Sequence, residues 1–266
     1  LKHISKKYIS DLQLPNLNRI DMESVLKILD KADLVQKKRQ QVIENSNELL
    51  CSIFEYMFNQ DKILNYEVSS IEKMLKNEKN SIRTGPFGSQ LLHSEFVENG
   101  VCVLGIDNAV KNKFSWGQPR FITEEKYSQL KRYTVKPGDV IITIMGTCGR
   151  CAVVPNDIPK AINTKHLCCI TLDQNKCLPE FLHSYFLMHP ISLDYLATKS
   201  KGAIMDGLNM GLIKSMPIPK IPVSYQRDYV AKKIKIMNDI KNHELALQQS
   251  KELYDALVQN LFKEGI

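Results

Sequence analysis

Two stretches of the chain, at about residues 21–58 and 224–262, contain neither glycine nor proline. In both, apolar residues recur at alternating steps of three and four, the spacing that places them on one face of an α-helix. At a rise of 1.5 Å per residue, each stretch predicts a helix roughly 55 Å long. Helices of this length are much longer than the average helix of a globular domain, so ordinary packing within a globule does not account for the two segments.

The spacing in both helices is typical of a coiled-coil seam. Polar residues interrupt each apolar stripe at comparable positions along the helix, such as Gln36 and Arg39 in the first helix and His243 in the second. The predicted seam consists of Val25, Leu29, Ala32, Ile43, Leu50, Ile53 and Met57 from the first helix, and Tyr229, Ile236, Ile240, Leu247, Tyr254, Leu257 and Leu261 from the second.

The two helical segments also repeat one another at a constant offset. Pro15 aligns with Pro219, Leu17 with Ile221 and Phe58 with Phe262. A proline shortly before each helix marks an extended segment that turns into the helix. The alternative is a pair of unrelated amphipathic helices packed on one globule, and the repeated proline lead-in argues against it.

The chain between the helices, about residues 59–222, has a different pattern. It holds every glycine except Gly265 and most of the prolines. Short apolar runs separated by turn residues predict strands at 101–106, 139–145, 150–154 and 166–172, and residues 179–197 predict a helix. The expected fold class is α+β: a mixed α/β globule flanked by two long α-helices that form an antiparallel coiled coil.

Composition and charge narrow the class of protein. A net charge of +7 suits a polyanionic partner such as nucleic acid. No run of 18 apolar residues is present, so we expect no membrane span. Seven cysteines, an odd number without a secretory leader, favour a reducing, cytoplasmic location over a disulfide framework.

A series of short segments in the globule resembles the target recognition domains of specificity (S) subunits of type I restriction–modification systems. Each segment alone is a weak signal, but their order between two repeated helices is specific. They are RTGPFGS at 83–89, VLGIDN at 103–108, FIT at 121–123, YTVKPGDVI at 133–141, GTCGR at 146–150, PEFL at 179–182, GLN at 207–209 and MPIP at 216–219.

The resemblance covers nearly the whole chain from about Ile9, and it implies an arrangement of domains. The family pattern is two recognition domains alternating with two long helices, whereas here the first domain is missing except for a tail. The implied divisions are a tail at 1–20, a first spacer helix at 21–60, a target recognition domain at 61–222 and a second spacer helix at 223–266. The chain is then either part of a full subunit or a half-length version that pairs with a second copy.

The resemblance also implies a function and partners. The protein is expected to read one half of a bipartite site on double-stranded DNA, with the helices fixing the distance between reading heads. The implied partners are the modification (methyltransferase) subunits and the restriction/translocase subunit, which would bind S-adenosylmethionine, ATP and magnesium. No cofactor is expected in this chain.

Two kinds of side chain are candidates for contacting DNA. Lysine and arginine neutralise phosphates, whereas Asn, Gln, Arg and Ser pair with base edges. The phosphate candidates are Arg83, Lys111, Lys113, Arg120, Arg132, Lys165, Lys199 and Lys201. The base candidates are Ser89, Gln90, Asn108, Arg150, Asn163, Thr164, His166 and Asn209. For each of them, an ordinary solvated or turn-forming role is the alternative.

The sequence gives little support for metal binding or catalysis. Cys148 and Cys151 have the spacing of zinc ligands, but adjacent Cys168 and Cys169 would point to opposite faces of a strand, which favours small core residues. No phosphate-binding loop, methyltransferase motif, nucleophile elbow or nuclease arrangement occurs in the sequence. We therefore expect a non-catalytic DNA-recognition subunit; the alternatives are a DNA-modifying enzyme fragment and a coiled-coil scaffold that binds only protein.

Overall fold

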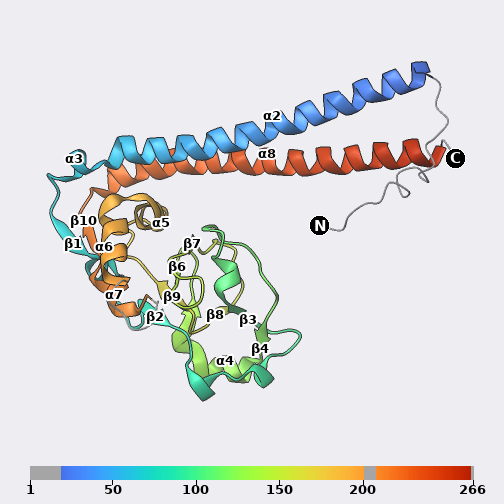
Figure 1. Ribbon diagram of the computed structural model, residues 1–266. Coiled ribbons are helices and arrows are strands. Elements are labelled where there is room, and N and C mark those ends of the chain that lie inside the picture. Colours follow the sequence, from blue (N-terminus) through green and yellow to red (C-terminus); the bar gives the residue numbers. More distant parts are fainter. Residues whose placement is uncertain (1–18, 201–207, 265–266) are drawn as a thin grey trace. The chain divides into compact units, whose positions relative to one another are not determined.

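The computed structural model describes residues 19–200 and 208–264 (Figure 1). Its residues form two compact units: a helical unit that extends to Leu50 and resumes at Lys233, and a globular unit, Cys51–Lys232. The predicted tail at 1–20 lies almost wholly outside the described residues, as do Lys201 and the side chain of Leu261.

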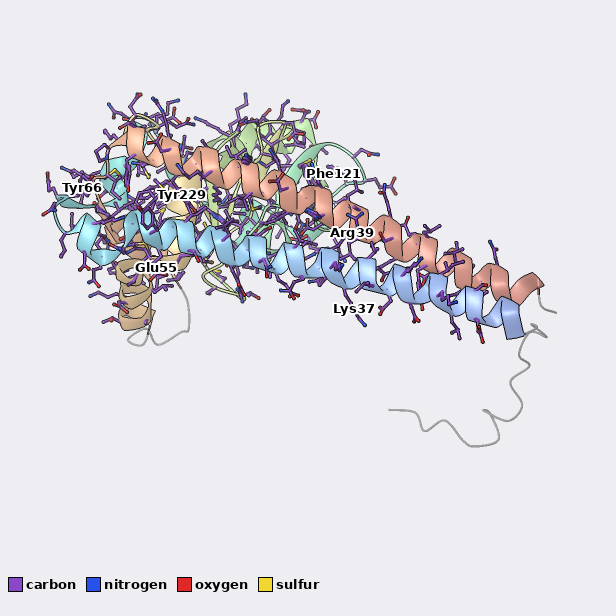
Figure 2. All side chains as sticks on the ribbon, turned by 90° about the horizontal axis from the view of Figure 1, so that it is seen from above. Lys37, Arg39, Glu55, Tyr66, Phe121 and Tyr229 are labelled. Atoms are coloured by element: carbon purple, nitrogen blue, oxygen red, sulfur yellow. The ribbon has the colours of Figure 1, made fainter. Side chains whose placement is uncertain are left out.

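The two long helices lie where the sequence predicts them. Helix α2 spans Arg19–Phe58 and helix α8 spans Val223–Glu264. In the helical unit they run side by side (Figures 1 and 2), and Gln36 Nε2 of α2 donates to the carbonyl oxygen of Ser250 in α8 at 3.3 Å. The expected fold class, a mixed α/β globule between two long helices, is confirmed.

Burial along the helical unit follows the predicted three-and-four spacing. Between residues 23 and 50 of α2, the partly buried positions are Val25, Leu29, Ala32, Gln36, Arg39, Ile43, Ser46 and Leu50. On α8, Ile240 and Leu247 are only 3% and 8% exposed. Arg39 points toward α8 and Lys37 away from it (Figure 2). Polar residues thus occupy part of the seam, which is why its hydrophobic pattern is interrupted.

Two four-stranded sheets form the centre of the globular unit. One has the antiparallel order β2-β9-β6-β7, and the other has the order β4-β3-β8-β5 with a parallel β3–β8 pair. A two-stranded sheet joins β1 to β10. The strands are β1 Val68–Ser70, β2 Ile82–Thr84, β3 Val101–Leu104, β4 Phe121–Ile122, β5 Thr134–Val135, β6 Val140–Thr143, β7 Cys151–Val153, β8 Ala161–Asn163, β9 Leu167–Ile170 and β10 Pro217–Pro219.

Short helices connect these strands. The α-helices are α3 Gln60–Ile63, α4 Glu124–Leu130, α5 Pro179–Met188, α6 Pro190–Ser200 and α7 Met210–Ser215, and the 3-10 helices are η1 Ile71–Met74, η2 Gly88–Gln90, η3 His93–Glu95, η4 Ile106–Asn108 and η5 Lys131–Tyr133. The single helix expected at 179–197 is wrong: it is broken into α5 and α6. His189 adopts an extended conformation because it precedes Pro190, which disfavours the helical region for that residue.

Strand β9 separates two hydrophobic clusters of the globule. Cys168 packs in one cluster and Cys169 in the other, as the alternation of side chains along a strand requires. Burial raises the pKa of the Cys168 thiol to about 12, so the thiol stays protonated at neutral pH. Among the described residues, no group of three or more His, Cys, Asp or Glu side chains is placed to hold a metal ion.

An aromatic cluster ties the ends of both long helices into the globular unit. Phe58 of α2 lies 5.0 Å from Phe181 and 5.3 Å from Tyr229 between ring centroids. The Phe58 carbonyl oxygen is 3.0 Å from Nε2 of buried His189. Since Nδ1 of the same ring accepts from the Ile191 amide, the neutral tautomer with hydrogen on Nε2 satisfies both bonds. None of the helices in the described part of the chain has a stretch long and apolar enough to cross a membrane.

Candidate nucleic-acid interface

Four loops of the globular unit pack against one another and carry most of the predicted DNA contacts. We call residues 85–90, 105–120, 145–150 and 164–166 the loop cluster. The Gly85 amide donates to the Thr164 carbonyl at 3.2 Å, and the Thr164 amide donates to the carbonyl of Leu104, next to the second loop, at 2.9 Å. The Cys151 amide, next to the third loop, donates to Asn112 Oδ1 at 3.2 Å. The cluster is therefore a continuous feature assembled from segments far apart in sequence.

Glycines allow this close packing. A Cβ at Gly85 would stand 2.0 Å from the Asn163 carbonyl oxygen, so only glycine permits the 85–90 loop to lie on the 163–164 backbone. Gly146 and Gly149 have positive φ angles of 71° and 76°, which a turn of this kind needs. The GPFGS and GTCGR motifs are thus explained by turn geometry and backbone approach.

Several candidate residues are exposed in or near the loop cluster. Gln90 accepts a hydrogen bond from the Tyr133 hydroxyl at 2.8 Å, which leaves its amide nitrogen directed elsewhere. The exposed candidates in the loop cluster are Ser89, Gln90, Lys111, Lys113, Arg150 and Lys165. Outside the loop cluster, Arg132, Lys199 and Asn209 are exposed as well. Asn209 also caps helix α7 by accepting from the Leu212 amide at 2.9 Å.

Arg83, Asn108 and Asn163 were predicted to contact DNA, and the structure shows that they do not face solvent. Arg83 is 5% exposed and forms an ion pair with Asp139. Asn108 accepts from the Gly105 amide at 2.8 Å and donates to the Ser115 carbonyl at 3.0 Å. Asn163 is fully buried and donates to the Leu167 carbonyl at 2.9 Å. We assign all three a structural role, because their hydrogen bonds are made inside the globular unit, although Arg83 Nε and Asn163 Oδ1 are buried without a hydrogen-bond partner among the described residues.

Arg120, Thr164 and His166 are partly buried at the centre of the loop cluster. Arg120 forms an ion pair with Asp107 and keeps 30% of its side chain exposed. Burial, followed by the charges of Lys165 and Arg120, lowers the pKa of His166. The imidazole is therefore neutral near pH 7, and a neutral imidazole can both donate and accept a hydrogen bond, as base edges require.

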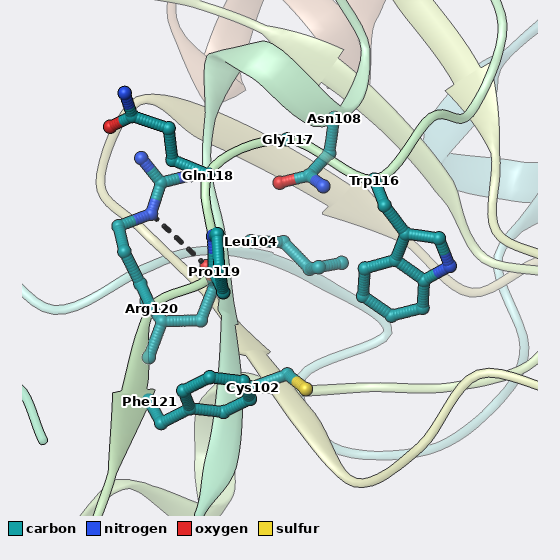
Figure 3. Close-up of a pocket in the computed structure, with 10 residues that line it drawn as sticks. Cys102, Leu104, Asn108, Trp116, Gly117, Gln118, Pro119, Arg120 and Phe121 are labelled. Carbon is teal, nitrogen blue, oxygen red and sulfur yellow. Dashed lines mark hydrogen bonds between the residues drawn. The ribbon is translucent and has the colours of Figure 1, made fainter. Parts of the chain in front are cut away.

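Sequence reasoning missed Trp116, the only tryptophan of the chain. It is 59% exposed and lines a pocket of about 240 Å³ in the 105–120 loop together with Gln118 and Arg120 (Figure 3). The available signal was a lone tryptophan three residues after Lys113 and four before Arg120, in a segment with no strand or helix pattern. That pattern is compatible with a core residue, and only the structure shows the ring in solvent.

The chain has relatives among known proteins in sequence and in fold. No protein-family profile matches the chain. Its sequence is 23% identical over 251 residues to the specificity subunit of the type I restriction enzyme EcoBI of Escherichia coli, an alignment that covers 86% of this chain and 52% of that protein. The chain therefore spans about half the length of this curated relative.

Solved structures show the same architecture. The S subunit of a type I restriction–modification system from M. genitalium matches with a TM-score of 0.58 and 14% identity, covering 92% of this chain and 61% of that one. A chain from a structural study of how the type I restriction–modification system assembles matches with a TM-score of 0.60 and 16% identity. The match covers 92% of this chain and 58% of that one.

The chain thus consists of a mixed α/β globular unit with exposed polar loops and a helical unit of two long, paired helices. In sequence and in fold it is similar to the specificity subunits of type I restriction–modification systems, so the resemblance indicated by its motifs is confirmed.

Proposed function

We propose that this chain binds double-stranded DNA and reads one half of a bipartite target for a type I restriction–modification complex. The observation that carries the proposal is the similarity to specificity subunits over 86% of the chain in sequence and 92% in fold. The globular unit would read the half-site, and the chain itself would carry no catalytic centre.

The chemistry of the loop cluster supports this proposal. Lys111, Lys113 and Lys165 are exposed and suited to phosphates, while Gln90 and Arg150 are suited to base edges. The loops are braced by hydrogen bonds to one another, so their backbone would lose little conformational freedom on binding DNA.

The helical unit supports a role in assembly. Outside the seam, α2 carries a second apolar stripe at intervals of seven residues: Ile28, Val35, Val42 and Leu49 are 53%, 44%, 39% and 50% exposed. Apolar residues repeated along one exposed helix face favour packing against a further helix. We propose that this stripe is the surface that packs against the modification subunits. The modification subunits, together with the restriction/translocase subunit, would bind S-adenosylmethionine, ATP and magnesium. A chain with one recognition domain would need a second copy to read both half-sites.

Salt dependence of DNA binding tests the proposal. The logarithm of the binding constant for a random-sequence duplex should fall linearly with the logarithm of salt concentration, because bound lysines displace counterions. Lys111→Ala and Lys165→Ala should each lower the slope by about one and weaken binding to all duplexes alike. Lys38→Ala, on the exposed face of α2, is the matched control and should leave the slope unchanged.

Two results would contradict the proposal. Absence of duplex binding at low salt would favour the scaffold that binds only protein. Methyl transfer to DNA by the purified chain without partner subunits would favour the DNA-modifying fragment.

A further inference from the structure

Trp116 presents a large apolar ring to solvent on a loop that is rigidly held. The side chain is 59% exposed, while its neighbour Phe114 is half-buried and packs against a core cluster. The two ring centroids are 5.3 Å apart with an interplanar angle of 86°, so Phe114 supports the indole from the side of the globule. An exposed tryptophan with such support is suited to a binding surface, where tryptophan contributes large contact area at small entropic cost.

The loop that carries Trp116 is fixed by its own hydrogen bonds. The Asp107 carboxylate accepts a hydrogen bond from the backbone amide of Gln118 at 2.9 Å and forms an ion pair with Arg120. The Asp107 side chain leaves no room for a larger residue at position 117, because a Cβ there would stand 1.7 Å from its Oδ2 atom. The backbone that follows Trp116 is therefore held in place within the loop.

A pocket of about 240 Å³ lies beside the indole, and we call it the Trp116 pocket. Figure 3 shows Trp116 on one side and Gln118 and Arg120 on the opposite side, with Leu104 between them and Phe121 below. The volume is below the range of drug-sized ligand sites, about 300–1,000 Å³, and suits a single flat ring system.

Cationic side chains lie on the loop that forms the Trp116 pocket. Lys111 and Lys113 are exposed on this loop, and Arg120, which pairs with Asp107, lines the pocket and keeps 30% of its side chain exposed. An aromatic ring next to lysines matches a flat base joined to a phosphate backbone: the ring stacks on the base, and the cations neutralise the flanking phosphates.

We propose that the Trp116 pocket receives one unstacked nucleobase, which lies against the indole face with Gln118 at its edge. This inference rests on the proposed DNA-binding function and adds a stacking residue to it. Stacking on an aromatic ring accepts any base, whereas the exposed amide of Gln118 can pair with adenine. The base can come from a duplex, by extrusion, or from DNA that is already unpaired.

Fluorescence of the full chain tests this directly, because Trp116 is its only tryptophan. The chain is titrated with a fully paired duplex, the same duplex with one bulged base, and the single strand, each carrying a label whose anisotropy reports binding. At saturation, the indole emission should be quenched and its accessibility to acrylamide reduced. Quenching by all three DNAs identifies extrusion from the duplex, and quenching only by the bulged and single-stranded DNAs identifies a base that was already unpaired.

Variants separate stacking from general binding. Trp116→Ala should weaken binding of the bulged duplex by roughly 5- to 100-fold, and Trp116→Phe should restore most of it because a stacking face is kept. Leu64→Ala removes another exposed apolar side chain, 72% exposed, and should change nothing.

The outcomes are distinguishable from those of the proposed function. Saturated anisotropy with unchanged indole emission and accessibility in all three titrations overturns the inference and leaves DNA binding intact. Unchanged affinity of Trp116→Ala for the bulged duplex and the single strand also overturns it, because no base would then stack on the ring. Absence of any anisotropy change overturns the inference together with the proposed function.

Discussion

Replacing Arg83 by methionine is expected to lower the free energy of unfolding of the protein by about 3–5 kcal/mol. The Arg83 and Asp139 side chains are 5% and 1% exposed, and their ion pair is supplemented by bonds from Arg83 to the Thr171 hydroxyl and the Asn80 carbonyl, both at 3.0 Å. Removing the guanidinium leaves the Asp139 carboxylate buried without its counter-charge. Urea denaturation followed by circular dichroism measures the loss.

Two further variants isolate the cause. Arg83→Met combined with Asp139→Leu removes both charges and should recover much of the stability, since no buried ion is then left alone. Arg150→Met changes an exposed arginine of the loop cluster and should leave unfolding unchanged. If Arg83→Met unfolded like the unaltered protein and instead lost DNA affinity, the assignment of Arg83 as a structural residue would be wrong.

Phe58→Ala is expected to destabilise the protein by about 3–5 kcal/mol, the usual range for truncating a buried phenylalanine. Phe58 is 1% exposed and lies at the centre of the aromatic cluster that ties α2, α5 and α8 together within the globular unit. The cavity would loosen the attachment of both helices at once, so thermal unfolding should begin at lower temperature.

Tyr56→Ala is the matched control, because Tyr56 lies two residues away on the same helix and is 74% exposed. Its effect on unfolding should stay within about 0.5 kcal/mol. Equal destabilisation by the two substitutions would mean that helix propensity, and not packing of the aromatic cluster, sets the stability of this region.

The long helices could be predicted because their pattern is local and is repeated over many turns. The polar residues in the seam did not obscure it, since they fall on the same spacing as the apolar ones. The four predicted strands correspond to β3, β6, β7 and β9 to within a few residues, whereas the remaining strands of the described chain, each two or three residues long, were not predicted. Pro190 ends helix α5 where apolar periodicity alone continues it. Periodicity therefore located the elements, and backbone restrictions decided where they end.

Predicting the site was harder because a polar residue next to a turn has two possible uses. Asn108 and Asn163 carry the same groups as a base-reading asparagine, yet both are buried and hydrogen-bond to nearby backbone. Arg83 is buried because it pairs with partners far away in the sequence, such as Asp139, 56 positions away, whereas Arg150 is exposed. Contacts between distant segments decide which polar side chains are exposed, and a single sequence does not display those contacts.

Selection of bound sequences from a pool of randomised DNA duplexes tests the central claim, that the globular unit reads DNA sequence. The full chain is incubated with the pool at low and moderate salt, and the retained duplexes are sequenced. We predict enrichment of one short motif that sharpens as salt weakens the phosphate contacts, and Gln90→Ala or Arg150→Met should alter the motif without abolishing binding. Retained duplexes with the same base frequencies as the starting pool at every salt concentration would contradict the claim.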